Sequence, residues 1–296
     1  MAFRAVLIAT CLCLSGAAIA QDAGTLTSKP LPPLSNPNDP ALPAKELFGR
    51  SATPAKMEAK PIGFYSRGCL AGADMLPFDG EAWQVMRLSR NRNWGHPELV
   101  SFLQRVAREM RAQKIWPGLL VGDMSQPRGG PMFTGHASHQ IGLDADVWFT
   151  PMPERRFTRQ EREELSATNL VREDGMDVET QLFGAQQIAL LKYVAQQGEV
   201  ERVFVNPAIK KAICRDARGD RSWLGKIRPM YGHNYHFHIR LSCPAGEETC
   251  RAQEPPPQSD GCDKSLDWWF TDEAMHPKPV TLAQLPGACR AVLQAK

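Results

Sequence analysis

The stretch GHNYHFHIRL, residues 232–241, decides the fold of this chain because apolar and polar side chains alternate along it. The apolar members are Tyr235, Phe237, Ile239 and Leu241, and the polar members are His236, His238 and Arg240. A period of two residues predicts a β-strand with one face in the core. The two strand histidines therefore lie side by side on the opposite face of the sheet.

A second histidine-rich stretch, GHASHQIGLDADVWF at residues 135–149, ends in the same alternation. We expect Leu143, Ala145, Val147 and Phe149 to point inward, which leaves Asp144, Asp146 and Trp148 on the opposite face. If the two strands are antiparallel neighbours, the Asp146 carboxylate meets His236 and His238 across about 5 Å. A helix would hold His139 about 10 Å from Asp146, so a loop must return it, and Gly142 supplies the backbone freedom.

Two imidazoles and one carboxylate are a common ligand set for catalytic zinc, with water in the open position. We therefore predict that zinc is bound by His139, Asp146 and His238. The sequence has no H-E-x-x-H motif to supply a glutamate for proton transfer. His233 and His236 are the candidates for that role, because an ordinary imidazole pKa near 6.5 suits acid–base catalysis at neutral pH.

The alternative interpretation is that these histidines are structural, which is the usual role of a single histidine such as His96 or His276. Five of the seven histidines fall in the two stretches, together with an aspartate in phase on a strand. The sequence pattern is also compatible with a structural role for the whole cluster or with a metal site that has no catalytic activity. Clustering nevertheless favours a shared metal-binding role.

Other periodic segments predict an α+β fold. Leu99, Leu103, Val106 and Met110 recur at helical spacing within residues 97–113, and a second helix is expected at 184–197. Short strands are expected at 119–122 and 200–205, with a third helix starting at Asn206 and Pro207. We expect a small antiparallel sheet that carries the zinc site and is flanked by helices. Residues 21–61 contain eight prolines and are interpreted as an extended arm.

The first twenty residues have the features of a signal peptide. Arg4 precedes an apolar run of about ten residues, and Ala18-x-Ala20 is a cleavage site. An uncleaved N-terminal anchor is the alternative. No later segment approaches the roughly 20 apolar residues that a membrane span needs. We expect a signal peptide at 1–20, the arm at 21–61 and one domain at 62–296.

Six cysteines follow the signal segment, and an even number in an exported chain predicts three disulfides. Six cysteines allow 15 pairings, and the spacing does not choose among them. The net charge of +3 gives no electrostatic reason to expect nucleic acid as a partner. These features together predict an exported periplasmic protein whose metal ligands are histidine and carboxylate.

The histidine motifs resemble those of the LAS metallopeptidases, a group with lysostaphin-type enzymes, D-Ala-D-Ala metallopeptidases and hedgehog domains. The resemblance is carried by S-H-Q-x-G-x-D-x-D at residues 138–146 and by H-x-H at 236–238. Further matches at VGDMSQPRGG (121–130) and FVNPAIK (204–210) point to the penicillin-insensitive murein endopeptidase family. The likeness runs from about residue 60 to the C-terminus.

This resemblance implies a zinc-dependent endopeptidase that hydrolyses D-alanyl–meso-diaminopimelyl cross-links of peptidoglycan. It implies zinc ligands at His139, Asp146 and His238, a further metal-site histidine at His136, and proton transfer by His233 and His236. Which of the last two is the base stays open, as does activity on L,D cross-links. The alternatives are a D-Ala-D-Ala carboxypeptidase or dipeptidase, and a wall-binding module without turnover.

The resemblance also implies a homodimer with a second zinc at Asp174 and Asp177 of the subunit interface. Carboxylates at those positions are equally consistent with a solvated turn. The disulfides implied by the resemblance are Cys69–Cys289, Cys214–Cys262 and Cys243–Cys250.

Overall fold

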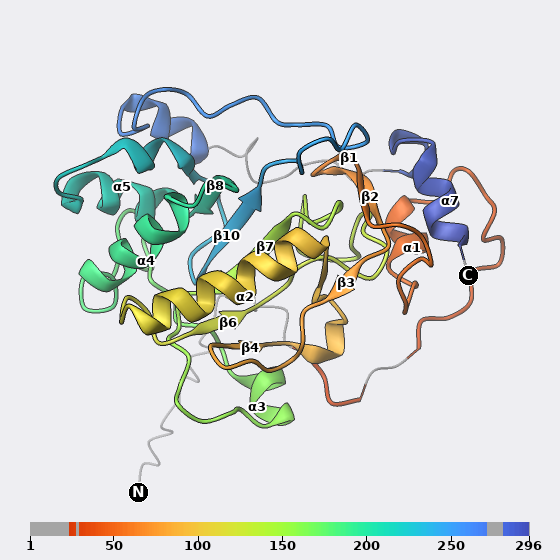
Figure 1. Cartoon of the computed structure of the whole chain (residues 1–296), viewed down its shortest axis with the longest axis horizontal. Coiled ribbons are helices and arrows are strands. Elements are labelled where there is room, and N and C mark those ends of the chain that lie inside the picture. Colours follow the sequence, from red (N-terminus) through yellow and green to blue (C-terminus); the bar gives the residue numbers. More distant parts are fainter. Residues whose placement is uncertain (1–23, 28–29, 271–280, 296) are drawn as a thin grey trace, which may run out of the picture.

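The computed structural model describes residues 24–27, 30–270 and 281–295 (Figure 1). The segment interpreted as a signal peptide, residues 1–20, lies outside the described residues. Within the described ranges, no helix combines the length and the apolar character needed to cross a membrane.

A six-stranded sheet forms the centre of the fold and confirms the predicted α+β class. Its strands, in spatial order, are β4 (Trp83–Val85), β6 (Leu119–Val121), β7 (Asp144–Trp148), β10 (His236–Leu241), β8 (Val200–Val205) and β9 (Ile227–Pro229). The middle pairs β6–β7, β7–β10 and β10–β8 are antiparallel, as expected. The outer pairs β4–β6 and β8–β9 are parallel, which the local alternation of residues did not indicate.

Three helices, α2 (Pro97–Ala112), α4 (Ala185–Ala195) and α5 (Pro207–Asp216), correspond to the predicted helices and pack on the sheet. Figure 1 shows α2 running across the central strands. Proline occupies the first turn of α2, and the His96 side chain caps it by accepting a hydrogen bond from the Glu98 amide. Asn206 caps α5 in the same way, through the Ala208 amide.

The main hydrophobic core lies between these helices and one face of the sheet. It contains the predicted inward-facing residues of both histidine stretches, namely Leu143, Ala145, Val147, Phe149, Phe237, Ile239 and Leu241. Every residue of β7 and β10 is buried, including the polar ones. The alternation in these strands therefore separates an apolar buried face from a polar buried face, and the polar face carries the histidines.

The remaining elements surround this core. They are α1 (Ala44–Phe48), β1 (Lys60–Phe64), β2 (Arg67–Ala71), β3 (Asp74–Met75), η1 (Leu88–Arg90), β5 (Trp94–Gly95), α3 (Arg159–Glu164), η2 (Ser222–Lys226), η3 (Lys264–Phe270), η4 (Leu282–Gln284) and α7 (Ala288–Gln294). The proline-rich arm includes the short helix α1, whose Ala44 and Phe48 share a second hydrophobic cluster with Cys289 and Val292 of α7. The arm and the C-terminal helix thus stabilise each other.

Three disulfides connect distant parts of the chain and confirm the pairing that the resemblance implied. Cys69–Cys289 joins β2 to α7, Cys214–Cys262 joins α5 to the segment before η3, and Cys243–Cys250 closes a short loop after β10. The first of them spans 220 residues and links the hairpin that follows the arm to the C-terminal helix.

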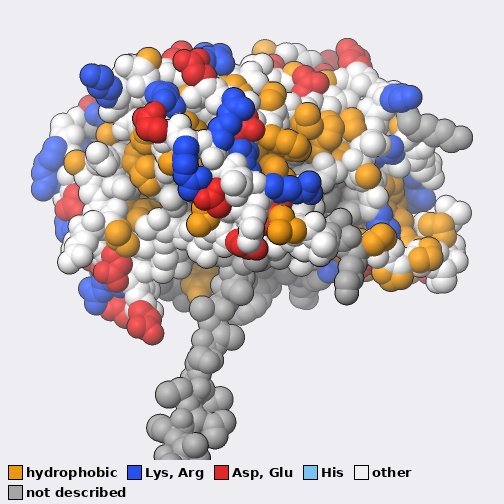
Figure 2. Space-filling model, turned by 90° about the horizontal axis from the view of Figure 1, so that it is seen from below, with side chains coloured by type: hydrophobic (Ala, Val, Ile, Leu, Met, Phe, Trp, Pro, Cys, Tyr) orange, Lys and Arg blue, Asp and Glu red, His pale blue; other side chains and the backbone are white. Residues whose placement is uncertain are grey.

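Charged side chains are mixed on the face of the molecule shown in Figure 2. Lysine and arginine side chains alternate there with aspartate and glutamate side chains, and hydrophobic side chains lie between them. This face therefore presents no extended field of one sign, in keeping with the small net charge of +3.

Candidate metal centre

The pairing of β7 with β10 places the polar residues of the two histidine stretches opposite one another. Asp146 is the direct partner of His238, and Asp144 is the direct partner of Arg240. Directly opposed residues of antiparallel strands project from the same face. Asp146, His236 and His238 therefore share the polar face of the sheet, as the alternation predicted.

His139 reaches this face from the loop before β7. Its backbone has a φ of +64°, in the left-handed region that is uncommon for residues other than glycine. Gly142 has a φ of +75°, and a Cβ atom there would lie 2.5 Å from the Leu70 side chain and 2.8 Å from the His96 amide. The loop therefore requires glycine at this point, and it returns the His139 imidazole to Asp146.

Three donor atoms from His139, Asp146 and His238 face a common point. The Nε2 atom of His139 and the Nδ1 atom of His238 are 3.1 Å apart. Each of these nitrogens lies 3.3 Å from Asp146 Oδ1, a buried atom without a hydrogen-bond partner among the described residues. A buried carboxylate oxygen is costly to leave unpaired, so this arrangement favours a cation between the three atoms.

His136 approaches the other oxygen of the same carboxylate. Its Nδ1 atom lies 3.4 Å from Asp146 Oδ2, and its Nε2 atom lies 2.8 Å from Asp123 Oδ2. Asp123 also accepts hydrogen bonds from Arg90 and Arg92, at 3.0 Å and 2.8 Å. The Asp123 carboxylate thus holds His136 by one nitrogen while the other faces Asp146. His136, His139 and Asp146 form one group with metal-binding spacing.

His233 and His236 complete the cluster of five histidines. His236 Nε2 lies 3.5 Å from Asp146 Oδ2, and Asp146, His233 and His236 form a second group with donor atoms within 4.8 Å. His233 Nδ1 lies 3.2 Å from the Tyr231 carbonyl oxygen, which accepts the proton on that nitrogen. The Nε2 atom of His233 is then the one able to accept a proton from a bound molecule.

His238 belongs to neither of these two groups, yet its Nδ1 atom is the one 3.1 Å from His139. The distances nevertheless place His238 beside Asp146, because Nδ1 of His238 and Nε2 of His139 lie equally close to Asp146 Oδ1. His139, Asp146 and His238, the residues predicted as zinc ligands, thus place three donor atoms 3.1 to 3.3 Å from one another.

Burial and neighbouring charges shift the pKa values of the whole cluster. Burial lowers the pKa of His139 to about 4 and also lowers the pKa values of His233 and His236. Burial alone would raise the pKa of Asp146, but the histidines around it hold that pKa well below its usual range. His139 is thus neutral and Asp146 ionised near pH 7, which are the forms that bind a metal.

His238 behaves differently from its neighbours. Burial alone would lower its pKa, but the carboxylates of Asp144 and Asp146 outweigh this effect and raise the pKa. Metal binding at Nδ1 therefore competes with a proton at that atom.

Asp174 and Asp177 lie away from this arrangement, in the turn between Val171 and Val178. Asp174 pairs with Arg172, and Asp177 pairs with Arg215 at 2.7 Å. Neither aspartate belongs to the two groups with metal-binding spacing found among the described residues. Their role as ligands of a second zinc stays a prediction.

The residues that sequence reasoning missed are the partners of the histidines, Asp123, Asp144 and Arg240. Asp123 and Asp144 are both buried, and their pKa values are held below the usual range although burial alone would raise them. Asp144 was placed on the correct face by the alternation, but nothing in the sequence pattern marks it as a partner of His238. Asp123 follows β6 and lies outside both histidine stretches, so no alternation in the sequence placed it near the histidines.

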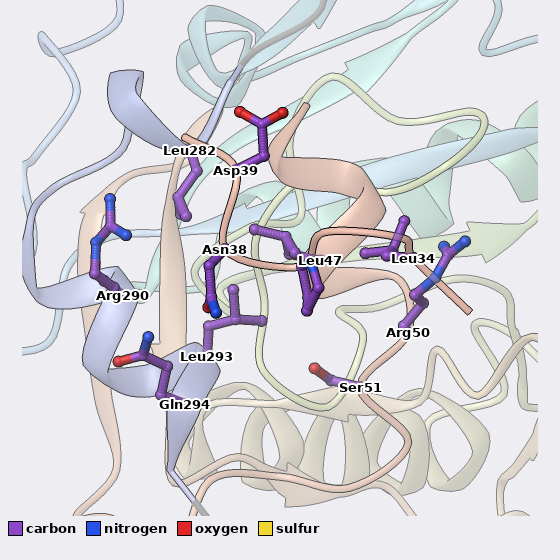
Figure 3. Close-up of a pocket in the computed structure, with 11 residues that line it drawn as sticks. Leu34, Asn38, Asp39, Leu47, Arg50, Ser51, Leu282, Arg290, Leu293 and Gln294 are labelled. Carbon is purple, nitrogen blue, oxygen red and sulfur yellow. The ribbon is translucent and has the colours of Figure 1, made fainter. Parts of the chain in front are cut away.

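A cavity of about 300 Å³ lies elsewhere, between the arm, α1 and α7 (Figure 3). Its lining includes Leu34, Leu47, Leu293, Arg50 and Arg290. None of the clustered histidines contributes to it. The cavity therefore belongs to the packing of the arm on the C-terminal helix and not to the metal centre.

Comparison with known proteins identifies the family of this chain. The family model described as penicillin-insensitive murein endopeptidase matches residues 61–294. The penicillin-insensitive murein endopeptidase of Klebsiella pneumoniae subsp. pneumoniae is 43% identical over 238 residues, covering 79% of this chain and 86% of that protein. The protein of the same name from Haemophilus influenzae is 43% identical over 229 residues, covering 77% and 78%. The one from Escherichia coli O1:K1 / APEC is 42% identical over 243 residues, covering 81% and 88%.

The model match covers most of the chain and includes every residue of the histidine cluster. It also agrees with the resemblance seen in the motifs at residues 138–146 and 236–238. This chain belongs to the penicillin-insensitive murein endopeptidase family.

Proposed function

We propose that this protein is a zinc-dependent endopeptidase that hydrolyses D-alanyl–meso-diaminopimelyl cross-links in peptidoglycan. One observation carries the proposal: three donor atoms of His139, Asp146 and His238 lie 3.1 to 3.3 Å from one another. Tetrahedral zinc with bonds of about 2.0–2.1 Å separates its ligand atoms by about 3.4 Å. The spacing of the three atoms thus suits zinc, and the family supplies the class of substrate.

His139, Asp146 and His238 would hold the zinc, which would supply a Lewis acid to polarise the scissile carbonyl and make a water molecule more acidic. The chain itself supplies the proton transfer. His233 and His236 place donor atoms within 4.8 Å of Asp146. Burial keeps the pKa values of both histidines low, so both are neutral bases at pH 7. One of them accepts the proton of the attacking water, and a protonated imidazole then delivers it to the leaving amine.

His136 completes the site in this proposal. Because Asp123 engages its Nε2 atom, its Nδ1 atom faces Asp146 and is available as a further ligand. No serine nucleophile takes part in this chemistry, and β-lactams act by reacting with such a serine. The proposed mechanism is therefore insensitive to penicillin.

The cellular setting follows from the same features. Three disulfides suit an oxidising compartment, and peptidoglycan lies in the periplasm, so we place the mature protein there. We retain the division into a signal peptide at 1–20, an arm at 21–61 and a catalytic domain at 62–296. A homodimer with a second zinc at Asp174 and Asp177 is part of this proposal and is tested by its mass in solution with and without zinc.

Digestion of purified cross-linked muropeptide dimers tests the function directly. We expect monomers as products, no reaction after metal removal with EDTA, and recovery when zinc is returned. Dimers that remain intact with zinc-loaded protein would contradict the proposal. Release of terminal D-alanine without cleavage of dimers would instead assign a carboxypeptidase, and zinc binding with neither reaction would assign a wall-binding module.

A further inference from the structure

Asp144 contacts both of the histidines that face Asp146 Oδ1. Its Oδ1 atom lies 2.9 Å from Nε2 of His238, and its Oδ2 atom accepts a hydrogen bond of 2.9 Å from the backbone amide of His139. This contact is short enough for an ion pair, but its angle lies outside that of a regular hydrogen bond. Asp144 is fully buried and lies two residues from Asp146 on β7. One side chain thus reaches two candidate ligands by different routes.

Arg240 fixes Asp144 in place. Its guanidinium donates to both carboxylate oxygens, at 2.8 Å from Nε and 3.2 Å from Nη2, and to Gln253 Oε1 at 2.8 Å. The guanidinium carbon also lies 4.1 Å from the centre of the Tyr65 ring and 5.0 Å from that of Phe204. A planar bidentate pair between two aromatic rings leaves the carboxylate little freedom to rotate.

We propose that Asp144, held by Arg240, is a positioning residue for zinc, and this inference rests on the zinc site proposed above. A carboxylate accepts only, so the His238 nitrogen that faces it must carry the proton. The lone pair then sits on Nδ1, the atom that lies 3.1 Å from His139 Nε2 and 3.3 Å from Asp146 Oδ1. Asp144 therefore selects the His238 tautomer that binds metal.

His139 is positioned through its backbone. Its left-handed conformation is unfavourable for a residue with a side chain, so contacts on both sides must hold it. Asp144 accepts from its amide, and the Ser125 hydroxyl donates to its carbonyl oxygen at 2.6 Å. These two hydrogen bonds orient the peptide units around His139 and direct its imidazole at the metal position.

The alternative is that Asp144 and Arg240 form an ordinary buried ion pair whose only role is stability. Such a pair accounts for the bidentate contact, but it assigns no role to the contacts of Asp144 with His139 and His238. The two interpretations differ in what they predict for metal affinity, because a purely structural pair affects unfolding and leaves the choice of tautomer untouched.

The variant Asp144→Asn separates the two interpretations. An amide in place of the carboxylate turns an N–H₂ group toward one of the donors from His139, His238 or Arg240. We expect zinc affinity to fall about 10- to 100-fold, measured by competition with a chromophoric chelator. Substitution with Co²⁺ should give a changed visible d–d absorption spectrum, because the ligand geometry at the ion is altered.

Glu163→Gln is the matched control, since Glu163 is a fully buried carboxylate that accepts hydrogen bonds from the Ser89 amide and hydroxyl. We expect this control to keep wild-type zinc affinity and the wild-type Co²⁺ spectrum, even if thermal unfolding of the metal-free protein shifts. An equal loss of zinc affinity in Glu163→Gln would overturn the positioning role and assign the effect to stability.

Arg240→Lys covers the case in which Asp144→Asn does not fold. This variant keeps the positive charge but loses the bidentate contact. We therefore expect its zinc affinity to fall below that of the wild type, but by less than in Asp144→Asn. Wild-type affinity and spectrum in the folded variants would overturn the inference. Failure of the wild-type protein to bind zinc would contradict the proposed function instead, and the two failures are thereby distinguishable.

Discussion

The Nε2 atom of His139 lies 3.1 Å from the Nδ1 atom of His238, although the two residues are 99 positions apart in the chain. Two imidazole nitrogens at this distance share either a proton or a cation. The carboxylate oxygen Oδ1 of Asp146 lies 3.3 Å from both, so the three atoms enclose one point. This relationship is the basis of the predictions about the metal.

Asp146→Asn should strongly weaken zinc binding at neutral pH. The amide keeps the shape of the side chain but removes the negative charge at the centre of four histidines, which are His136, His139, His236 and His238. We expect zinc affinity to fall by more than about 100-fold, beyond the loss typical of partners outside the ligand set, and activity to fall with it. Asp220→Asn, at an exposed carboxylate, should leave both unchanged. Zinc content after dialysis checks the result, and full zinc occupancy in Asp146→Asn would remove Asp146 from the ligand set.

His236→Ala should separate metal binding from turnover. His236 lies 3.5 Å from Asp146 Oδ2 and does not face Oδ1, so its loss leaves the ligand atoms of zinc in place. We expect zinc content close to wild type and a fall in kcat of about 10²- to 10⁴-fold, the usual contribution of a general acid–base group. His233→Ala is the companion variant. Loss of turnover in His233→Ala alone would assign the base to His233, and wild-type turnover in both would contradict the proton-transfer role.

Lys210 should make stability depend on pH above neutrality. Burial lowers its pKa to about 7, and its Nζ donates to the Leu224 and Asp260 carbonyls at 2.9 Å and 2.5 Å. Between pH 7 and the ordinary lysine pKa of about 10.4, the unfolded chain binds this proton more strongly than the folded one. The free energy of unfolding therefore rises with pH in that window, by up to about 1.4 kcal/mol per pH unit from this group.

Comparison of the wild type with Lys210→Met isolates this contribution. Urea unfolding with the disulfides intact, measured at several pH values from 7 to 10, should show a smaller slope for the variant. Below pH 7 the lysine is protonated in both states, so the two slopes should converge there. Equal slopes above pH 7 would mean that Lys210 retains an ordinary pKa in the folded protein.

The Cys69–Cys289 disulfide should contribute more to stability than the Cys243–Cys250 disulfide. The first spans 220 residues and the second spans 7. The loop-entropy relation gives about 5 kcal/mol for the long loop and about 2 kcal/mol for the short one, as upper values. Double replacement by alanine should therefore lower the free energy of unfolding more in Cys69→Ala/Cys289→Ala. A larger loss for the short-loop variant would indicate that native-state contacts, rather than loop entropy, set the contribution.

Local sequence was sufficient for the main elements of the fold. The apolar spacing of Leu99, Leu103, Val106 and Met110 predicted α2, and Asn206 with Pro207 predicted the start of α5. These features depend on residues within one or two turns, so a single sequence carries them. The parallel pairing of β4 with β6 and of β8 with β9 was missed because strand order depends on distant segments.

In the metal centre, too, local sequence predicted some features and distant contacts set the others. Period-two alternation by itself placed His236 and His238 on one face of a strand and Asp146 on the corresponding face of another, because alternate residues of a strand must share a face. Only the tertiary structure decided which nitrogen of each imidazole faces Asp146, and that Asp144 and Asp123 engage the other nitrogen of His238 and His136. Ring orientation depends on the partner behind the ring, and those partners lie at distant positions in the chain that only the packed fold brings together.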